Sequence, residues 1–239
     1  MTSGDFLLLV FEDEAAHEAL PPWEMAAHLD AQDRFAATLR ARGALVDGGR
    51  LRPSREGRRV RGEGAHPAGK PALERGPFDG ESLALALFYR VRAATLDEAA
   101  ALIADCPTLA ADVIEVRPVM KGWLDGDRAL RRGRVFGFVV LGCAPSHEAW
   151  DEVMDRIDAE TREVFPARAF LGGVRLHGPG RGRRRAGHAV VDGPFAEGRE
   201  VIGGLFFVRA ASVDDAVSWA VTSPFVAHGA LELRELWRS

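Results

Sequence analysis

An aspartate at the start of a short charged turn is the side chain in this sequence that best suits proton chemistry. Asp192 opens the stretch DGPFAEGRE at residues 192–200, and His188 precedes it by four positions. A carboxylate held beside an apolar turn can have a raised pKa and serve as a general acid or base. A histidine titrates near pH 6.5 and can carry a proton between groups. We therefore predict Asp192 and His188 as catalytic residues.

Both residues also allow an interpretation without a substrate. An Asp before Gly-Pro commonly accepts hydrogen bonds from amides two or three residues on and so fixes a turn. If residues 188 and 192 share one face of a strand, they lie roughly 13 Å apart at about 3.3 Å per residue, which is too far for a direct pair unless the strand bends. His188 is then a partly exposed side chain with no chemical role.

The residues around and after this turn form the predicted ligand-binding set. A cluster of acid, base and acid can orient a ligand or tie the loop to another part of the chain, and glycines permit the close approach of a ligand or of backbone. The set comprises Phe195, Glu197, Arg199, Glu200, Gly203 and Gly204.

The same turn occurs twice. Residues 76–119 align without a gap with residues 193–236, at an offset of 117, and Gly-Pro-Phe recurs at 76–78 and 193–195. Arg75 stands in the place of Asp192, so the motif of the first copy is degenerate. The period is too long for a solenoid, whose repeats run about 20 to 50 residues, so each copy is a whole domain. We predict domains at 1–121 and 134–239, joined by a linker at 122–133.

Each copy is predicted to fold in the order β-α-β-β-β-α-β. The apolar strands at 6–11 and 135–141 come first, and helices follow, the first with an apolar stripe from Trp23 to Leu39 and the second at 146–164. Strands at 44–51 and 170–176 lead through an Arg-rich connection to the turn. The tetrapeptides TLDE at 95–98 and SVDD at 212–215 predict capped short helices. Alternating strands at 113–119 and 231–236 close the copies.

The chain resembles the YCII-related, or DGPF-domain, family. The resemblance is carried by DGPFAEGRE and the following Gly-Gly, by the opening LLLVF, by LVDGG after the first helix, and by the endings IEVRPV and LELREL. It covers nearly the whole chain as two copies. It implies an α+β fold of two tandem ferredoxin-like domains, of the dimeric α/β-barrel superfamily, packed sheet to sheet as an intramolecular pseudo-dimer that could also form a homodimer.

The resemblance leaves two hypotheses of function open. In the first, a small molecule is bound or transformed near Asp192 by general acid/base chemistry, as in superfamily relatives that are lyases or isomerases and act through a His and an Asp; a hydrolase is a further option. In the second, the protein is a non-catalytic accessory or regulatory protein, since DGPF relatives often occur beside extracytoplasmic-function sigma factors.

Composition and the remaining polar residues limit the classes of partner and cofactor that we expect. A net charge of −4 argues against nucleic acid. The apolar run at 6–11 is too short for a membrane span, which predicts a cytoplasmic protein. The two cysteines and the histidines lack metal-ligand spacing, so we expect no metal and no cofactor. His28, roughly where shorter family members carry a helical His, is interpreted as a core or boundary residue. The Arg-rich connections at 52–61 and 181–185 are interpreted as solvated loops.

Overall fold

The computed structural model describes residues 4–62, 71–78, 83–122, 130, 132–142, 164–166, 169–187, 189–193 and 201–237. The chain divides into two compact units, each built from three separate stretches. Unit 1 comprises Met1–Arg50, Gly80–Val119 and Gly180–Phe195, and unit 2 comprises Leu51–Asp79, Met120–Pro179 and Ala196–Ser239. Both are mixed α and β structures around antiparallel strands.

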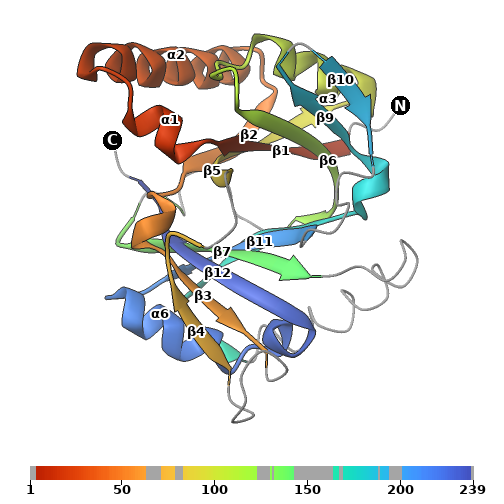
Figure 1. The fold of residues 1–239 in the computed structure, drawn as a ribbon. Helices are drawn as coiled ribbons and strands as arrows, with labels where there is room; N and C mark the ends of the chain where they lie inside the picture. Colours follow the sequence, from red (N-terminus) through yellow and green to blue (C-terminus); the bar gives the residue numbers. More distant parts are fainter. Residues whose placement is uncertain are drawn as a thin grey trace. The chain divides into compact units, whose positions relative to one another are not determined.

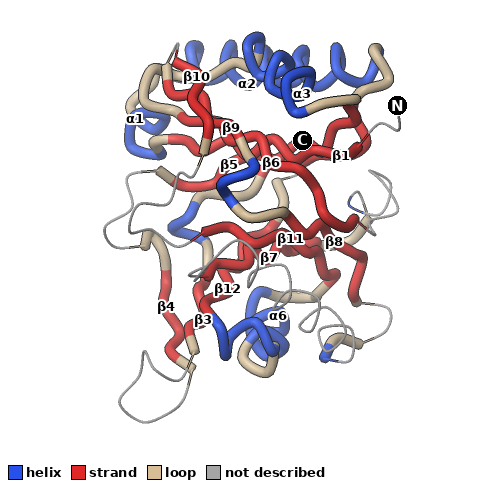
Figure 2. The backbone as a smooth tube through the Cα atoms, turned by 90° about the vertical axis from the view of Figure 1, so that its right-hand side faces the viewer, coloured by secondary structure: helices blue, strands red, loops and turns tan. Residues whose placement is uncertain are grey.

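Unit 1 is an antiparallel sheet covered by helices on one face (Figures 1 and 2). The strand order is β2 (Leu45–Arg50), β5 (Ala84–Ala93), β1 (Gly4–Glu12), β6 (Val113–Gly122), β9 (Arg183–Ala186) and β10 (Ala189–Asp192). The helices are α1 (Glu14–Glu18), α2 (Pro22–Ala41) and α3 (Leu96–Leu102), which η3 (Ile103–Asp105) extends.

The core of unit 1 follows from the two periodicities of the sequence. Alternate residues of β1, among them Leu8 and Val10, face the helices, and Phe35 and Leu39 fall one turn apart on α2. Asp13 caps α1 by accepting a hydrogen bond from the amide of Ala16 at 3.1 Å. The cap fixes where α1 begins after the end of β1, and the apolar stripe of α2 sets which of its faces packs against the sheet.

Unit 2 repeats this plan. Its strand order is β8 (Phe170–Leu176), β11 (Val201–Arg209), β7 (Val135–Gly142), β12 (Gly229–Glu235), β3 (Arg58–Arg61) and β4 (Ala72–Arg75). The helix α6 (Val213–Ala220) packs with the turn η5 (Pro224–His228) against an aromatic core that includes Phe138, Phe206 and Phe225. The short helical turns η1 (Ser54–Glu56) and η4 (Pro179–Arg181) precede β3 and β9.

Each short hairpin joins the strands of the other sequence copy. The hairpin β3–β4 comes from the first copy and pairs with β12 of the second, with Arg59 opposite Glu232. The hairpin β9–β10 comes from the second copy and pairs with β6 of the first, with Arg184 opposite Glu115. The compact units are therefore not continuous in sequence. The repeat boundaries at 1–121, 122–133 and 134–239, and the pseudo-dimer packing, stay predictions.

The prediction that the Arg-rich connections are solvated loops was wrong, because these segments contain the strands β3 and β9. Arg59 is 2% exposed and its guanidinium binds Glu232 at 2.5 Å, so the charge is buried with a partner. The ring of Phe78 lies under the same guanidinium, 3.9 Å from its carbon to the ring centroid. Arginines can occupy these strands because carboxylates on the neighbouring strands neutralise them.

The Gly-Pro-Phe turn has a structural task in both copies. The amide of Gly76 donates to the carbonyl of Gly57 at 3.4 Å, and the amide of Gly193 donates to the carbonyl of Gly182 at 3.0 Å. A Cβ on Gly76 would lie 1.8 Å from the carbonyl oxygen of Ser54, so only glycine fits there. The glycine at position 76 is thus explained by packing.

The predicted capped helices are confirmed. The hydroxyl of Thr95 accepts a hydrogen bond from the amide of Glu98, and that of Ser212 accepts one from the amide of Asp215, both at 3.1 Å. The predicted helix at 146–164 lies outside the described residues except for Val164, and the linker at 122–133 is described only in part.

In the part of the chain that the structure describes, no helix combines the length and the apolar character needed to cross a membrane. The cytoplasmic location stays a prediction.

Candidate functional site

Asp192 ends the edge strand β10, and its side chain is 79% exposed. Its carboxylate accepts a hydrogen bond from Nε of Arg183 at 2.8 Å, and the same guanidinium also pairs with Asp97. The structure therefore places Asp192 in an exposed ion-pair cluster of unit 1. A catalytic role for it stays a prediction.

The other residues predicted from the motif are placed in part. His188, Phe195, Glu197, Arg199 and Glu200 lie outside the described residues. Gly203 and Gly204 lie on β11 of unit 2, whereas Asp192 belongs to unit 1. A Cβ on Gly204 would lie 2.5 Å from the carbonyl oxygen of Val174, so this glycine permits close pairing of β11 with β8.

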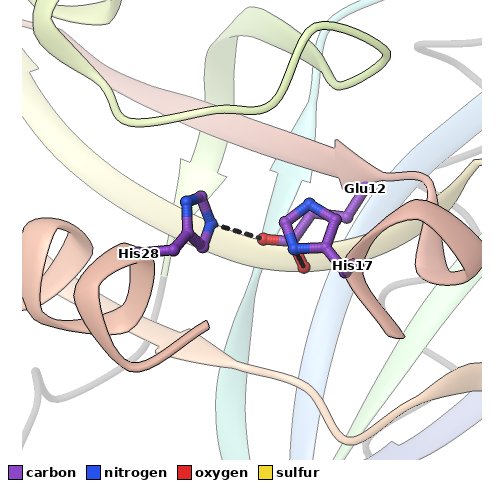
Figure 3. Close-up of side chains that lie close together, drawn as sticks. All are labelled: Glu12, His17 and His28. Carbon is purple, nitrogen blue, oxygen red and sulfur yellow. Dashed lines mark ion pairs between the residues drawn. The ribbon is translucent and has the colours of Figure 1, made fainter. Parts of the chain in front are cut away.

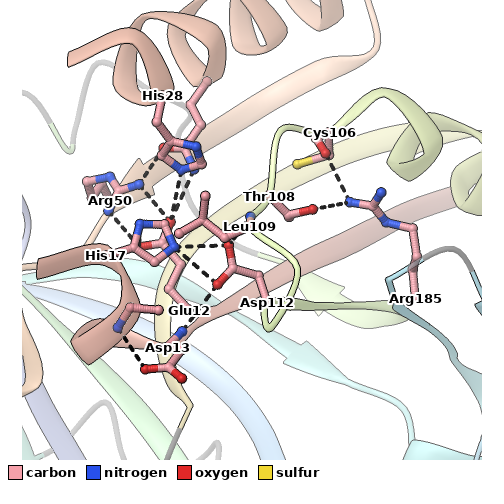
Figure 4. A network of polar contacts seen from close by, with 12 residues as sticks. Glu12, Asp13, His17, His28, Arg50, Cys106, Thr108, Leu109, Asp112 and Arg185 are labelled. Atoms are coloured by element: carbon pink, nitrogen blue, oxygen red, sulfur yellow. Dashed lines mark hydrogen bonds and ion pairs between the residues drawn. The ribbon is translucent and has the colours of Figure 1, made fainter. Parts of the chain in front are cut away.

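A buried polar centre in unit 1 was not predicted from the sequence (Figure 4). It begins with Glu12, the last residue of β1, whose side chain is 4% exposed. Arg50, at the end of β2, donates to both oxygens of this carboxylate, at 3.0 and 2.8 Å. Gln32 of α2 donates a third hydrogen bond at 3.1 Å. The carboxylate is thus held ionised in the interior by a bidentate guanidinium.

His17 and Asp112 form the second part of the centre. Nε2 of His17, on α1, lies 3.1 and 3.0 Å from the two carboxylate oxygens of Asp112, which precedes β6. Nδ1 of His17 lies 3.9 Å from Glu12. A carboxylate only accepts hydrogen bonds, so Nε2 carries the hydrogen and Nδ1 is the nitrogen left to exchange a proton.

His28 joins the centre through Gln32. The amide oxygen of Gln32 accepts a hydrogen bond from Arg50, so the amide nitrogen faces Glu12 and His28. That nitrogen lies 2.8 Å from Nε2 of His28, which must accept, so the hydrogen of this imidazole is on Nδ1. The side chain of His28 is 9% exposed. It is a boundary residue, as predicted, but it belongs to a polar network.

The electrostatics of the centre favour an anion next to a cation. Burial by itself would raise the pKa of Glu12, but nearby His28 and the hydrogen bonds and charge of Arg50 lower it to about 2. Nε2 of His28 is 3.9 Å from Glu12, beyond hydrogen-bond distance, so Arg50 supplies the larger share. Burial would also lower the pKa of His17, but the hydrogen bond to Asp112 and the charges of Glu12 and Asp112 raise it.

Glu12, His17 and His28 are also the residues that could hold a metal ion (Figure 3). They offer three ligand atoms within 4.8 Å of one another. Arg50 already occupies both oxygens of Glu12, however, and Gln32 occupies Nε2 of His28. A metal would have to displace both, so the arrangement favours proton transfer over metal binding. The expectation that the protein uses no metal or cofactor stays a prediction.

In the described part of unit 2, the positions equivalent to the two carboxylates carry glycines. Phe11 pairs with Val113 in unit 1, and Leu141 pairs with Ala230, the repeat equivalent of Val113, in unit 2. The residue after Leu141 is Gly142, which therefore stands in the place of Glu12. At the offset of 117 residues that relates 76–119 to 193–236, Gly229 stands in the place of Asp112. Among the described residues, the chemical centre lies in the unit that contains Asp192.

The equivalent of Arg50 is retained in unit 2. Arg50 pairs with Leu87 and Arg175 pairs with Gly204, at corresponding positions of the two sheets. Nε of Arg175 lies 3.0 Å from the sulfur of Met120. The position equivalent to Arg50 therefore also carries an arginine, although Gly142 stands where unit 1 has Glu12.

Sequence reasoning missed the centre because its members are far apart in the chain. His17 and Asp112 are separated by 95 positions, and Glu12 and Arg50 by 38. The available signal was weak: a carboxylate directly after an apolar strand, followed by a histidine within a short capped helix. His28, at the helical position noted for the family, was the best clue.

Comparisons with known proteins identify a family. The sequence model of the YCII-related domain matches residues 6–123 and 171–239. A mutant chlorite dismutase from Candidatus Nitrospira defluvii, in complex with cyanide, is similar over 100% of this chain and 92% of its own, with 12% identity and a TM-score of 0.46. A heme-binding protein from Thermus thermophilus is similar over 99% of this chain and 92% of its own, with 12% identity and a TM-score of 0.43. Neither likeness carries an argument about function. No curated protein matches the sequence.

Proposed function

Because the chain belongs to the YCII-related domain family, matched in two segments, we propose that it binds and transforms a small molecule by general acid/base chemistry at the centre formed by Glu12, His17 and Asp112. The family assignment supports a two-copy protein and names no reaction. The chemistry is inferred from the His17–Asp112 pair, which is the single observation that carries the proposal.

His17 is the proton carrier in this proposal. Asp112 holds the Nε2 hydrogen, so that Nδ1 faces Glu12 across 3.9 Å. That gap is too long for a direct hydrogen bond, but an atom of a substrate, or one water molecule, placed beside the two atoms rather than between them lies within reach of both groups. Glu12 stabilises the imidazolium that forms when His17 takes a proton. Proton transfer of this kind serves a lyase, an isomerase or a hydrolase.

Arg50 is the most exposed side chain of the centre, so the proposal places the entry of a ligand beside it. Its side chain is 22% exposed, whereas those of Glu12 and Asp112 are 4% and 0% exposed. A ligand that carries a carboxylate or another anion would meet this guanidinium first. The pocket near Asp192 stays the alternative location for the chemistry, and its residues 194–200 lie outside the described part of the chain.

A metabolite screen tests the proposal and separates the two locations. Purified protein is incubated with a mixture of small carboxylic and carbonyl compounds, and consumption is followed by mass spectrometry for wild type, His17→Gln and Asp192→Asn. The proposal expects a compound that wild type and Asp192→Asn consume and that His17→Gln consumes about 10²-fold more slowly or less. Loss in Asp192→Asn alone would move the chemistry to the turn, and consumption by none of the proteins would favour the accessory hypothesis.

A further inference from the structure

We propose that Arg185, contributed by the exchanged hairpin of the second copy, is a positioning residue for the His17–Asp112 pair. The acid/base centre of unit 1 is then built by both sequence copies, although its chemical groups all come from the first. This inference rests on the proposed function, because it assigns a role to a residue that acts through Asp112.

The contacts of Arg185 support this role. Arg185 lies on β9 opposite Ile114 of β6, and its guanidinium reaches the loop that precedes β6. One guanidinium nitrogen donates to the carbonyl oxygen of Cys106 at 2.9 Å and lies 3.0 Å from the hydroxyl oxygen of Thr108 (Figure 4). Cys106 is buried, so this carbonyl has a charged donor in the interior. The loop is thereby fixed at its first and third residues.

The same loop orients Asp112. The amide of Leu109 donates to one oxygen of the Asp112 carboxylate at 2.6 Å, and the amide of Asp112 donates back to the carbonyl of Leu109 at 3.1 Å. The amide of Asp13, at the start of α1, donates to the other oxygen at 3.2 Å. Asp112 therefore has the geometry that His17 requires only while the loop from Cys106 keeps its conformation.

The other hairpin provides a natural comparison. Val60 of β3 pairs with Leu231, and Arg185 of β9 pairs with Ile114, the repeat equivalent of Leu231. Val60 is fully buried in the apolar core of unit 2, where Gly229 replaces Asp112. The arginine thus occurs in the unit with Asp112 before β6, and an apolar residue takes its place in the unit where Gly229 stands at that position.

The charge of Arg185 makes a sharp test possible. His17 is faced by Glu12 from β1, Asp112 from the loop before β6, Arg50 from β2, and His28 from α2, whose ring centroid is 4.9 Å away. Removing a positive charge near a histidine, by itself, raises the histidine pKa. Loss of the ordered Asp112 carboxylate has the opposite effect and lowers it. The direction of the change therefore distinguishes positioning from a simple charge effect.

The experiment is an NMR titration of the His17 imidazole in the full-length chain. The variants are Asp112→Asn, Arg185→Met, Arg185→Lys and the matched control Arg183→Met, which removes an arginine from the same strand without touching the loop. We expect a fall in the His17 pKa of about one unit or more in Asp112→Asn, a smaller fall in Arg185→Met, partial recovery in Arg185→Lys, and no change in the control.

The possible results separate the two proposals. A His17 pKa that stays the same or rises in Arg185→Met, while it falls in Asp112→Asn, overturns the positioning role and leaves the acid/base centre intact. No fall in Asp112→Asn argues against the centre itself. If Arg185→Met does not fold, Thr108→Val decides, because it removes one acceptor and leaves every charge in place; it must lower the His17 pKa for the inference to stand.

Discussion

His17 and Asp112 lie 95 positions apart in the chain, and their side chains are 3.0 Å apart in the interior of unit 1. The carboxylate is shared between this imidazole and two backbone amides, those of Asp13 and Leu109. The pair therefore combines a chemical role with a structural one, and the two can be separated by choosing the substitution.

Asp112→Ala should lower the free energy of unfolding by about 3 kcal/mol or more. The change removes the acceptor of His17 and of two amides, and it leaves the buried imidazole without its partner. Asp112→Asn, which keeps an acceptor oxygen, should cost less. Urea denaturation followed by circular dichroism measures both. Equal losses in the two variants would contradict this expectation, because they would mean that the acceptor oxygen kept by Asn contributes nothing without the charge.

Stability should be highest between roughly pH 4.5 and 6.5 as far as Glu12 and His17 determine it. The folded pKa of Glu12 is lowered from 4.5 to about 2, so its contribution is present above pH 4.5 and is lost as the pH falls toward 2. It is on the order of 3 kcal/mol. The folded pKa of His17 is raised above 6.5, so its contribution is present below pH 6.5 and is lost as the pH rises through the folded value.

Melting temperatures measured from pH 2 to pH 9 check these signs. Glu12→Gln should remove part of the acid-side decline, and His17→Gln should remove part of the alkaline-side decline. A profile unchanged by either substitution would mean that these groups do not differ in protonation between the folded and the unfolded chain.

Arg50→Ala should convert the polar centre into a zinc site. The variant removes the guanidinium from both oxygens of Glu12, which lie near two imidazoles, so that a metal has only the neutral Gln32 amide left to displace from Glu12 and His28. Wild type should melt at the same temperature with and without Zn²⁺. The variant should be destabilised and then rescued by Zn²⁺, by about 2.7 kcal/mol at a hundredfold excess over the dissociation constant. Stabilisation of wild type by Zn²⁺ would instead show that Arg50 yields to the metal.

Gly76→Ala should destabilise unit 2 by about 1 to 3 kcal/mol. The new methyl group would lie 1.8 Å from the carbonyl oxygen of Ser54, so the turn must move. Gly4→Ala is the control, because the nearest atom to a methyl group there is 3.7 Å away, and its effect should stay within about 0.5 kcal/mol. Thermal melts of the two variants against wild type provide the comparison.

Local elements of the fold could be predicted from the sequence because they depend on neighbouring residues. The apolar run at 6–11 lies within β1, and the hydroxyl and carboxylate of residues 95 and 98 form the predicted cap. The strands β3 and β9 could not be predicted, because strands rich in arginine are stable only beside partners that are distant in the chain. Arg59 and Glu232 are 173 positions apart.

The candidate site likewise divides into residues that a local motif reveals and residues that only tertiary contacts reveal. Asp192 was singled out for its motif, which is local, and the structure finds it exposed beside Arg183. Glu12 and Asp112 have no motif, since each simply borders a strand. Their significance comes from the tertiary contacts with Arg50 and His17, which no spacing in the sequence reveals.

The exchanged hairpins make the duplicated halves interdependent. A gene cut at the linker would yield a first half with the acid/base groups and without β9, and a second half with the intact turn and without the strands that the turn braces. Two such fragments would have to associate to rebuild either sheet. Because each half contributes a hairpin to the sheet of the other, a substitution in one half also changes the sheet of the other. The half with the better-preserved motif therefore need not be the half that performs the chemistry.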